Sequence, residues 1–533
     1  MTYFSDAVQL FLRLEKTSSR IDKVRYLVDF IYKLSKDEYE PFIRILSGKI
    51  FPSYSNKTLD VGGALVFNVL KKVKERRESQ ITLVEFKPTI KNIYNSFEKI
   101  ASARGENSRK KKARILENLF LNLSDVEIEY LLRSIFGEMR IGVSEGIILE
   151  AFSKLVDIDL DKVRRAYMFI GDIGDLARIL AYKGGRGILD AHITLFRPVK
   201  PMLAEMSYDL REVFKEFRGI AGLEFKYDGV RIQVHKSKNN IKIFSRRLTD
   251  ITSSFPELLK IFREKIFADK AILDGEVIGI VEGKPIRFQD LAKRVRRRYD
   301  IEKMVYKIPL KPYFFDILYL NGEILVEKPY VDRWNILSKI VDKDLLAERI
   351  ITENIQTAKS FLKKAESLGH EGIMAKRLDS DYTPGIRGKK WFKIKPADTL
   401  DLVIVGAEWG HGRRRGWLSD YYLAVYDDEN DEFLIVGKTF KGLTDDEFRE
   451  MTKRLLELKI EDHGYMVKVK PEIVVEVAYN EIQQSSRYRS GYALRFARII
   501  RIRFDRNPHD ITTLKELKKR YEIQFKYKSQ IVE

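Results

Sequence analysis

The sequence of 533 residues contains no cysteine and only six histidines. Without cysteine, disulfide bonds, thiolate catalysis and cysteine-ligated zinc sites are excluded. The histidines form no HExxH arrangement, which argues against a histidine metal site. No apolar run reaches the roughly 18 residues of a membrane-spanning helix, and residues 1–20 lack the apolar core of a signal peptide. We therefore expect a cytoplasmic protein with no membrane partner.

Two nucleotide-binding motifs are also missing, since the sequence has neither a GxxxxGK[ST] string nor a GxGxxG string. What the sequence does have is a surplus of positive charge. Lys and Arg number 98 against 78 Asp and Glu, a formal net charge of +20. Such a surplus favours a polyanionic partner, and nucleic acid is the commonest one. The alternative is a solvated surface without any partner.

Length and composition indicate a globular protein of several domains, the first of them helical. Hydrophobic residues make up 44% of the chain and charged residues 33%, which allows sizeable cores. At about 150 residues per domain, the length predicts three or four domains. From Ser5 to about Leu189 apolar residues recur at helical spacing, as in Val24, Leu27 and Ile31. We predict an all-α domain over residues 1–195.

The pattern changes at Phe196–Pro201, where two closely spaced prolines favour extended chain and indicate a linker. Short runs rich in β-branched and aromatic residues follow, separated by turn signals such as Asn239-Asn240. These runs are Val230–His235, Ile241–Phe244, Ala271–Ile280, Tyr313–Leu320 and Gly372–Lys376. We predict an α+β domain, built on antiparallel sheet, over residues 196–398.

Short strands continue beyond residue 398, with a polar helical stretch between them. The strand candidates are Asp401–Val405, Tyr421–Tyr426, Phe433–Val436 and Ile473–Ala478. Their spacing fits a five-stranded β-barrel of the OB type, which we place at residues 399–533.

The densest chemical signal is the string Glu224-Phe-Lys226-Tyr-Asp228-Gly229-Val-Arg231, predicted to lie where one strand turns into another. A lysine attacks the α-phosphorus of a nucleotide only as the free amine. Its pKa must therefore be lowered by burial or by nearby positive charge, from Arg231 or from a bound metal ion. Asp228-Gly229 predicts a tight turn that phosphate can approach. A lone KxDG string also fits an ordinary surface hairpin.

Further strings give this signal more weight. Glu276, which ends Asp274-Gly-Glu276, and Glu371, which precedes Gly372–Lys376, are acids on separate predicted strands. Two such acids can share one Mg²⁺, which takes oxygen ligands and bridges phosphates. Ser245-Arg246-Arg247 follows a strand and could hold ribose and phosphates. Each of these groups, taken alone, also fits a solvated surface.

Aromatic and basic residues complete the set. In Phe314-Phe315-Asp316 one ring belongs to the core, and the other could stack on a purine. The segment from Arg387 to Lys395 ends in alternating basic and apolar residues. As a strand it points Lys393 and Lys395 to one face, which makes either a phosphate cradle or an ordinary solvated face.

These strings follow the order of the covalent nucleotidyltransferase family: KxDG, DGE, FD, EGxxxK and KxK. Over essentially its whole length the chain resembles an archaeal or eukaryotic-type ATP-dependent DNA ligase. Gly137–Gly146 resembles the stretch of the helical domain that approaches DNA, Pro198–Ala204 the entry to the adenylation domain, and Gly410–Trp417 a basic loop of the OB domain. The resemblance implies a multidomain fold: an all-α N-terminal DNA-binding domain, an α+β nucleotidyltransferase (adenylation) domain and a β-barrel OB-fold C-terminal domain.

The resemblance also implies a role for each matching residue. Lys226 would carry AMP, Glu224 would read the adenine edge, and Phe315, selected over Phe314 by the alignment through Asp316, would stack on adenine. The residues that would contact ribose and phosphates are Arg231, Arg246, Glu276, Arg387 and Lys393, with Lys395 assisting. Glu276 and Glu371 would hold Mg²⁺.

The implied reaction seals nicks in double-stranded DNA with ATP, through lysyl-AMP and an adenylylated 5′-phosphate, in DNA replication, repair and recombination. The implied partners are nicked duplex DNA and a sliding clamp, and the protein would be a nucleoid-associated monomer. Two alternatives stay open. An RNA ligase or a capping-type guanylyltransferase shares KxDG but not the helical domain. A non-catalytic DNA-binding scaffold would not need the intact Lys226, Glu276 and Glu371.

The C-terminal string departs from the family pattern. The family tends to end in R-x-D-K, whereas this chain reads Arg503-Phe-Asp505-Arg506. Because positive charge is kept, we expect these arginines to orient the leaving pyrophosphate. They can reach the nucleotide only if the barrel domain swings over it about a hinge near Lys395–Asp401. The alternative is that both arginines pair with acids on the barrel surface.

Overall fold

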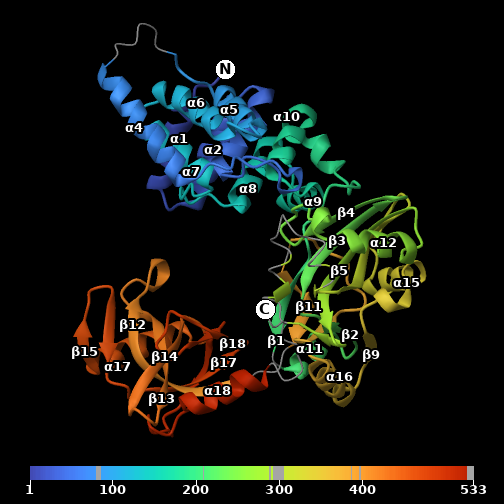
Figure 1. Ribbon diagram of the computed structural model, residues 1–533, viewed down its shortest axis with the longest axis vertical. Coiled ribbons are helices and arrows are strands. Elements are labelled where there is room, and N and C mark those ends of the chain that lie inside the picture. The colour runs from blue at the N-terminus through green and yellow to red at the C-terminus, as the bar shows by residue number, and fades with distance from the viewer. Residues whose placement is uncertain are drawn as a thin grey trace.

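The computed structural model describes residues 1–79, 86–207, 209–286, 290–291, 294, 305, 307–385, 387–394 and 398–524. Along the chain a helical region is followed by a region of two sheets and then by a strand-rich region (Figure 1). This order confirms the predicted fold class. None of the helices described is both long and apolar enough to cross a membrane.

The first region consists of helices packed around one apolar core. The helices are α1 (Phe4–Lys16), α2 (Arg20–Ile31), α3 (Tyr39–Ser47), α4 (Gly63–Ser79), α5 (Ile90–Ser102), α6 (Ser108–Leu121), α7 (Asp125–Phe136), α8 (Glu145–Val156), α9 (Leu160–Ile170) and α10 (Ile173–Leu189). Phe4, Phe11 and Phe42 are fully buried in the core. Local sequence sets the helix ends. In α7 a capping box of Ser124 and Glu127 begins the helix, and Gly137 ends it in the left-handed conformation.

The linker packs against the helical region through a partly buried ion pair. Lys200 Nζ lies 2.9 Å from Glu145 Oε2 and 2.5 Å from the Tyr167 hydroxyl. At Gly171, where φ is +75°, a Cβ would lie 2.3 Å from the Pro198 carbonyl oxygen, so only glycine allows this approach. The linker residues therefore fix where the next domain begins on the helical region.

Two sheets form the middle region. The first has strand order β1-β11-β10-β2-β9 and the second β4-β3-β5-β7-β8, with β6 paired to β5. The bounds of the first sheet are β1 (Leu203–Ser207), β2 (Ala221–Lys226), β9 (Arg349–Thr352), β10 (Gly372–Lys376) and β11 (Arg387–Ile394). The bounds of the second are β3 (Val230–Ser237), β4 (Asn240–Ser245), β5 (Lys270–Val281), β6 (Lys284–Pro285), β7 (Leu310–Leu320) and β8 (Glu323–Ile324). The predicted antiparallel pairing holds except for β1, which runs parallel to β11.

Helices cover these sheets and bury their apolar faces. They are α11 (Leu210–Glu216), α12 (Pro256–Lys265), α15 (Tyr330–Ile340) and α16 (Ile355–Ser367). Phe262 of α12 packs against Phe314 of β7, with 5.4 Å between the ring centroids. Phe361 of α16 packs against Phe225 of β2, with 4.8 Å between centroids. Each sheet therefore has its own apolar core.

The last region is a strand-rich domain that confirms the predicted OB-type architecture, although its main sheet has seven strands and not five. The strands are β12 (Asp398–Trp409), β13 (Leu418–Asp427), β14 (Glu432–Thr439), β15 (Lys459–Asp462), β16 (Met466–Val469), β17 (Val474–Tyr479), β18 (Glu481–Gln484), β19 (Tyr492–Arg495) and β20 (Arg498–Ile502). The helices are α17 (Asp445–Glu457) and α18 (Leu514–Ile523). Strand β12 pairs with β13 along one edge and with two strands along the other. On that second edge residues 398–403 pair with β17 and residues 406–408 with β16, and an irregularity between Ile404 and Gly406 separates the two stretches.

A buried ion pair joins α15 to β7. Arg333 and Asp316 are both fully buried, and the Arg333 Nε atom lies 2.7 Å from Asp316 Oδ1. We predict that Arg333→Met lowers the free energy of unfolding by about 3–5 kcal/mol, because it leaves the buried Asp316 carboxylate without its partner. Urea unfolding of the full chain, followed by tryptophan fluorescence, measures the change.

The matched control is Lys364→Met, which breaks an exposed pair with Glu348. That change should cost less than about 1 kcal/mol. A similarly small loss for Arg333→Met would show that the buried pair does not hold α15 on the sheet.

Candidate active site

Lys226 lies where the chain leaves one sheet for the other. It ends β2 of the first sheet, and β3 of the second sheet begins at Val230. The two strands are not paired, so the surface-hairpin interpretation of the KxDG string is wrong. Gly229 is required by close packing, since a Cβ there would lie 2.2 Å from the Val277 carbonyl oxygen of β5. The string thus connects the two sheets.

The amine of Lys226 forms an ion pair with the Glu371 carboxylate. The register of β2 and β10 sets this contact, because Lys226 pairs with Gly372 and its carbonyl accepts a hydrogen bond from the Glu371 N–H at 3.0 Å. Burial favours the neutral amine, but Glu371, Glu276 and Asp228 outweigh it and raise the pKa of Lys226. Before ATP binds, Lys226 is therefore a protonated lysine among acids.

Glu276 lies on β5 and is the second acid near Lys226. Burial raises its pKa to about 7, although Lys226 and Arg231 favour the ionised form; repulsion by Glu371 and Asp228 adds to the increase. Glu276 lines the same cavity as Lys226, which pairs with Glu371, so both carboxylates lie near the Lys226 amine. Among the described residues there is no cluster of three or more potential metal ligands. The protein thus offers two carboxylates, and the phosphates of a nucleotide suit the remaining positions around a Mg²⁺ ion.

The Arg231 guanidinium, one of the charges that the sequence offered as able to lower the pKa of Lys226, is bound by other residues. Arg231 pairs across the strands with Glu276, but its guanidinium is held elsewhere: Nη2 lies 2.8 Å from Asp274 Oδ2, and Nη1 donates to the Met202 carbonyl at 2.8 Å. Its Nε atom is buried without a hydrogen-bond partner in the described part of the chain. Asp274 thus fixes the guanidinium, and Nε stays available to a ligand.

These residues surround a cavity of about 620 Å³ at the junction of the two sheets. The predicted site residues that line it are Glu224, Lys226, Arg231, Arg246, Glu276, Phe315 and Lys393. The volume is in the range of pockets that hold ligands of nucleotide size. Arg387 begins β11, but its side chain lies outside the described part of the chain, as does the whole of Lys395. Glu371 is not among the residues that line the cavity, but its carboxylate forms an ion pair with Lys226, which does line it.

The two neighbouring phenylalanines of β7 have different environments. Phe314 is fully buried in the core of the second sheet. Phe315 is partly buried, lines the cavity, and meets the Trp391 ring edge-on at 6.2 Å. Alternation along the strand accounts for the difference. Of the two rings, Phe315 is therefore the one placed to stack on a base.

Sequence patterns did not single out four residues that fix this site. Tyr330 and Lys376 contact Glu224, while Asp274 and Tyr382 hold Arg231. Asp274 belongs to the DGE string and Lys376 to the EGxxxK string, so their positions in these motifs could have identified them. Tyr330 and Tyr382 had none, because their contacts arise only when distant segments fold together.

Comparisons with known proteins agree with this geometry. The family models "DNA ligase N terminus", "ATP dependent DNA ligase domain" and "ATP dependent DNA ligase C terminal region" match residues 3–153, 201–395 and 414–506. DNA ligase from Thermococcus onnurineus is 39% identical over 99% of both chains, and DNA ligase 1 from Korarchaeum cryptofilum is 40% identical over 98% of both. The chain belongs to the ATP-dependent DNA ligase family.

One solved structure supports the fold of this ligase. Pmar-Lig_PreS3 aligns with 93% of this chain and 99% of its own, at 19% identity and a TM-score of 0.55. Family membership gives the activity, ATP-dependent joining of DNA. It decides against the capping-type, RNA-ligase and non-catalytic alternatives.

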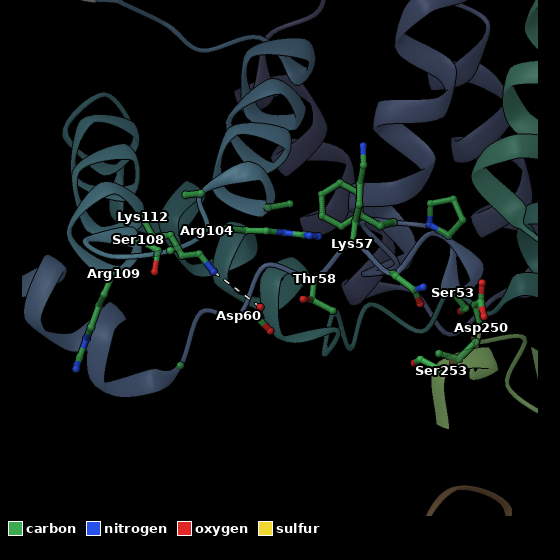
Figure 2. Close-up of a pocket in the computed structure, with 18 of the residues that line it drawn as sticks. Ser53, Lys57, Thr58, Asp60, Arg104, Ser108, Arg109, Lys112, Asp250 and Ser253 are labelled. Atoms are coloured by element: carbon green, nitrogen blue, oxygen red, sulfur yellow. Dashed lines mark ion pairs between the residues drawn. The ribbon is translucent and has the colours of Figure 1, made fainter. Parts of the chain in front are cut away.

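A larger cleft lies between the helical and sheet regions of the ligase. Its volume is about 1280 Å³. Residues 249–251 line this cleft, and two of them, Thr249 and Ile251, also line the nucleotide cavity. Figure 2 shows the basic side chains Lys57, Arg104, Arg109 and Lys112 along the helical side. Arg104 and Arg109 make no ion pair with any residue that the structure describes. Guanidinium groups that form no ion pair with the described residues, on the helical wall of this cleft, suit a polyanion.

The C-terminal arginines lie away from the nucleotide cavity. Its described lining includes no residue of the barrel domain, which Figure 1 shows to the side of the sheets. Arg503 Nη1 lies 3.1 Å from Asp401 Oδ1, and its Nη2 lies 2.8 Å from Asp505 Oδ2. Arg506 Nε lies 3.5 Å from Asp401 Oδ2. This arrangement agrees with the alternative that the sequence left open, in which both arginines pair with acids of the barrel domain.

Replacing Glu371 with glutamine should shift the pH dependence of Lys226 modification. The attacking amine must be neutral, so the rate rises as pH passes the pKa of Lys226. Because the Glu371 carboxylate raises that pKa, Glu371→Gln should move the rise to lower pH, even though the rate at saturating metal falls. Labelling with α-labelled ATP across pH gives both profiles.

Glu348→Gln is the control, since Glu348 is exposed and pairs with Lys364. Its profile should coincide with that of the unchanged protein. A Glu371→Gln profile that stays in place, or moves to higher pH, would exclude Glu371 as the group that holds the proton on Lys226.

Proposed function

We propose that this ligase seals nicks in duplex DNA through AMP bound to Lys226. The observation that carries the proposal is the placement of Lys226 at a nucleotide-sized cavity beside two acids. In the first step Lys226 Nζ, having lost its proton, bonds to the α-phosphorus of ATP. The bond to the bridging oxygen breaks, and pyrophosphate leaves with the electron pair. The AMP then moves to the 5′-phosphate at a nick, and the 3′-hydroxyl displaces it.

The cavity residues divide into a base side and a phosphate side. On the base side, Glu224 accepts from the adenine edge and Phe315 stacks on the ring. On the phosphate side, positive charge gathers to neutralise the charge that develops on the leaving group. The residues proposed for ribose and phosphates are Arg231, Arg246, Glu276, Arg387 and Lys393.

Mg²⁺ fits the two acids of the site. Glu276 and Glu371 would hold it, and the ion would neutralise phosphate charge when bound. The charge of the ion would also lower the pKa of Lys226, because it would compensate the two carboxylates that favour the protonated amine. Glu371 and Glu276 thus keep Lys226 inactive until ATP and the cation arrive together.

The other parts of the chain would hold the DNA. We place the DNA-binding domain at residues 1–195, the adenylation domain at 196–398 and the OB-fold domain at 399–533. The basic cleft beside residues 249–251 would take the phosphate backbone near the nucleotide site. Affinity should fall as salt rises, since phosphate contacts release counterions. A monomeric state, a sliding-clamp partner and a place in the cytoplasm at the nucleoid stay predictions of the resemblance.

Lys226→Ala should abolish covalent labelling by α-labelled ATP and all sealing that depends on ATP. Lys226→Arg should fail too, because a guanidinium stays protonated and cannot attack. Lys236→Ala, at a buried lysine of the second sheet, is the control and should keep its label. Label that persists in Lys226→Ala and maps to a different lysine would overturn the assignment.

We propose that the barrel domain swings over the cavity in the first step, so that Arg503 leaves its barrel acids and meets the departing pyrophosphate. Arg503→Ala should then slow formation of the AMP–enzyme by roughly 10²-fold, as expected for the loss of one charged donor at a leaving group. It should still seal DNA whose 5′-end is already adenylylated, since no pyrophosphate takes part there. The two rates are measured separately, on ATP and on preadenylylated nicked DNA.

The control is Arg501→Ala, which breaks a surface pair with Glu476. It should leave both rates near normal. Equal large losses in both reactions of Arg503→Ala would mean that Arg503 holds the barrel together, and no loss in either would mean that it only pairs with Asp401 and Asp505.

A further inference from the structure

Glu224, the acid on the base side of the cavity, is held by two buried donors. Its side chain is only 2% exposed. Lys376 Nζ lies 2.7 Å from Oε2, and the Tyr330 hydroxyl donates to Oε1. Lys376 comes from β10, next to β2, whereas Tyr330 is the first residue of α15. Two separate elements thus converge on one carboxylate.

Lys376 also reaches the opposite side of the base site. Its ammonium donates to the Phe315 carbonyl at 3.0 Å and lies 4.7 Å from the centroid of the Phe315 ring. The same ammonium lies 4.3 Å from the Trp391 ring. One side chain therefore fixes the distance between the acid that meets the base edge and the ring that meets the base face.

The Tyr330 hydroxyl acts on Glu224 as a fixed donor. Tyr330 is fully buried, and its ring is flanked by Lys376 at 4.7 Å and by Arg349 at 4.9 Å. Burial, together with the neighbouring Glu224 carboxylate, raises the pKa of Tyr330 well above its ordinary value, so the hydroxyl keeps its proton. Burial lowers the pKa of Lys376, while Glu224 and Asp316 favour its charged form.

A carboxylate held in this way can only accept hydrogen bonds from the base. An ionised carboxylate has about four lone-pair positions, of which Tyr330 and Lys376 occupy two. The 6-amino group of adenine donates and can use a remaining position. The 6-oxo group of hypoxanthine or guanine presents lone pairs there, and Glu224 has no proton to offer it. A site built to accept from a donor rejects an analogue that lacks the donor.

We propose that Tyr330 and Lys376 are positioning residues that restrict the ligase to 6-aminopurine nucleotides by holding Glu224 as a fixed acceptor. The inference rests on the proposed adenylylation of Lys226 and names its substrate class. Tyr330 is not among the residues that line the cavity, and it acts through Glu224. Lys376 lines the cavity beside Glu224 and acts by holding both Glu224 and Phe315 in place. ATP is accepted, and 6-oxopurine nucleotides such as ITP and GTP are rejected.

The test compares three nucleotides in the first reaction. kcat/KM for labelling of Lys226 is measured with ATP, with ITP and with purine riboside triphosphate, which has no substituent at position 6. The full-length protein should prefer ATP over ITP by at least about 10²-fold. In Tyr330→Phe the ring stays and only the hydroxyl is lost. ATP should then lose about tenfold, mostly through KM, while purine riboside triphosphate changes little.

Two further variants make the result specific. Tyr421→Phe removes another buried hydroxyl, one in the barrel core that has no hydrogen-bond partner among the described residues, and should leave all three values unchanged. Glu224→Gln supplies an amide that can donate as well as accept. It should raise the ratio of ITP to ATP use, and it tests the inference even if Tyr330→Phe folds poorly.

The outcomes separate the two proposals. If no nucleotide labels Lys226 in the unchanged protein, the adenylylation proposal itself fails. If ATP and ITP label Lys226 equally well, only the specificity inference is overturned. It is also overturned if Tyr330→Phe lowers all three values by the same factor, which would mean that the hydroxyl serves only the fold, or if Glu224→Gln leaves the ratio of ITP to ATP unchanged.

Discussion

The ion pair between Lys226 and Glu371 depends on the register of two antiparallel strands, and the rest of the site is arranged around it. The acids Glu371, Glu276 and Asp228 raise the pKa of the Lys226 amine and keep it charged, although burial favours its neutral form. A charged amine cannot attack phosphorus, so the site is inert on its own. In the proposed mechanism, a triphosphate bound with its cation would change the balance, because the positive charge would compensate the acids. The contact that restrains Lys226 would then also be the contact through which the substrate activates it.

Two sheets must meet for this chemistry, and one glycine allows it. Strand β2 supplies Lys226 and Glu224, while β5 of the other sheet supplies Glu276 and Asp274. The chain passes between the sheets at Gly229, where a side chain would collide with the backbone of β5. Pockets between packed sheets are rigid because each wall has its own core.

The sequence predicted the helical, α+β and barrel regions, because their hydrophobic periods differ and Phe196–Pro201 separates the first two. It also predicted residues that the fold does bring to one cavity, including Lys226 and Glu276. Their individual roles stay predictions. What it could not predict depends on long-range contact. The sequence did not indicate that Asp274 binds the Arg231 guanidinium, and the KxDG string joins two sheets where a hairpin was also possible. Local pattern carries no information about such partners.

The central claim is that AMP held on Lys226 is the intermediate that seals DNA. The most direct measurement isolates the labelled AMP–enzyme, removes all ATP, and adds duplex DNA with a single nick. The account predicts that label leaves Lys226, appears on the 5′-phosphate, and is released as AMP while the nick closes, with at most one nick sealed per labelled protein. Label that stays on the protein while sealing waits for fresh ATP would contradict it.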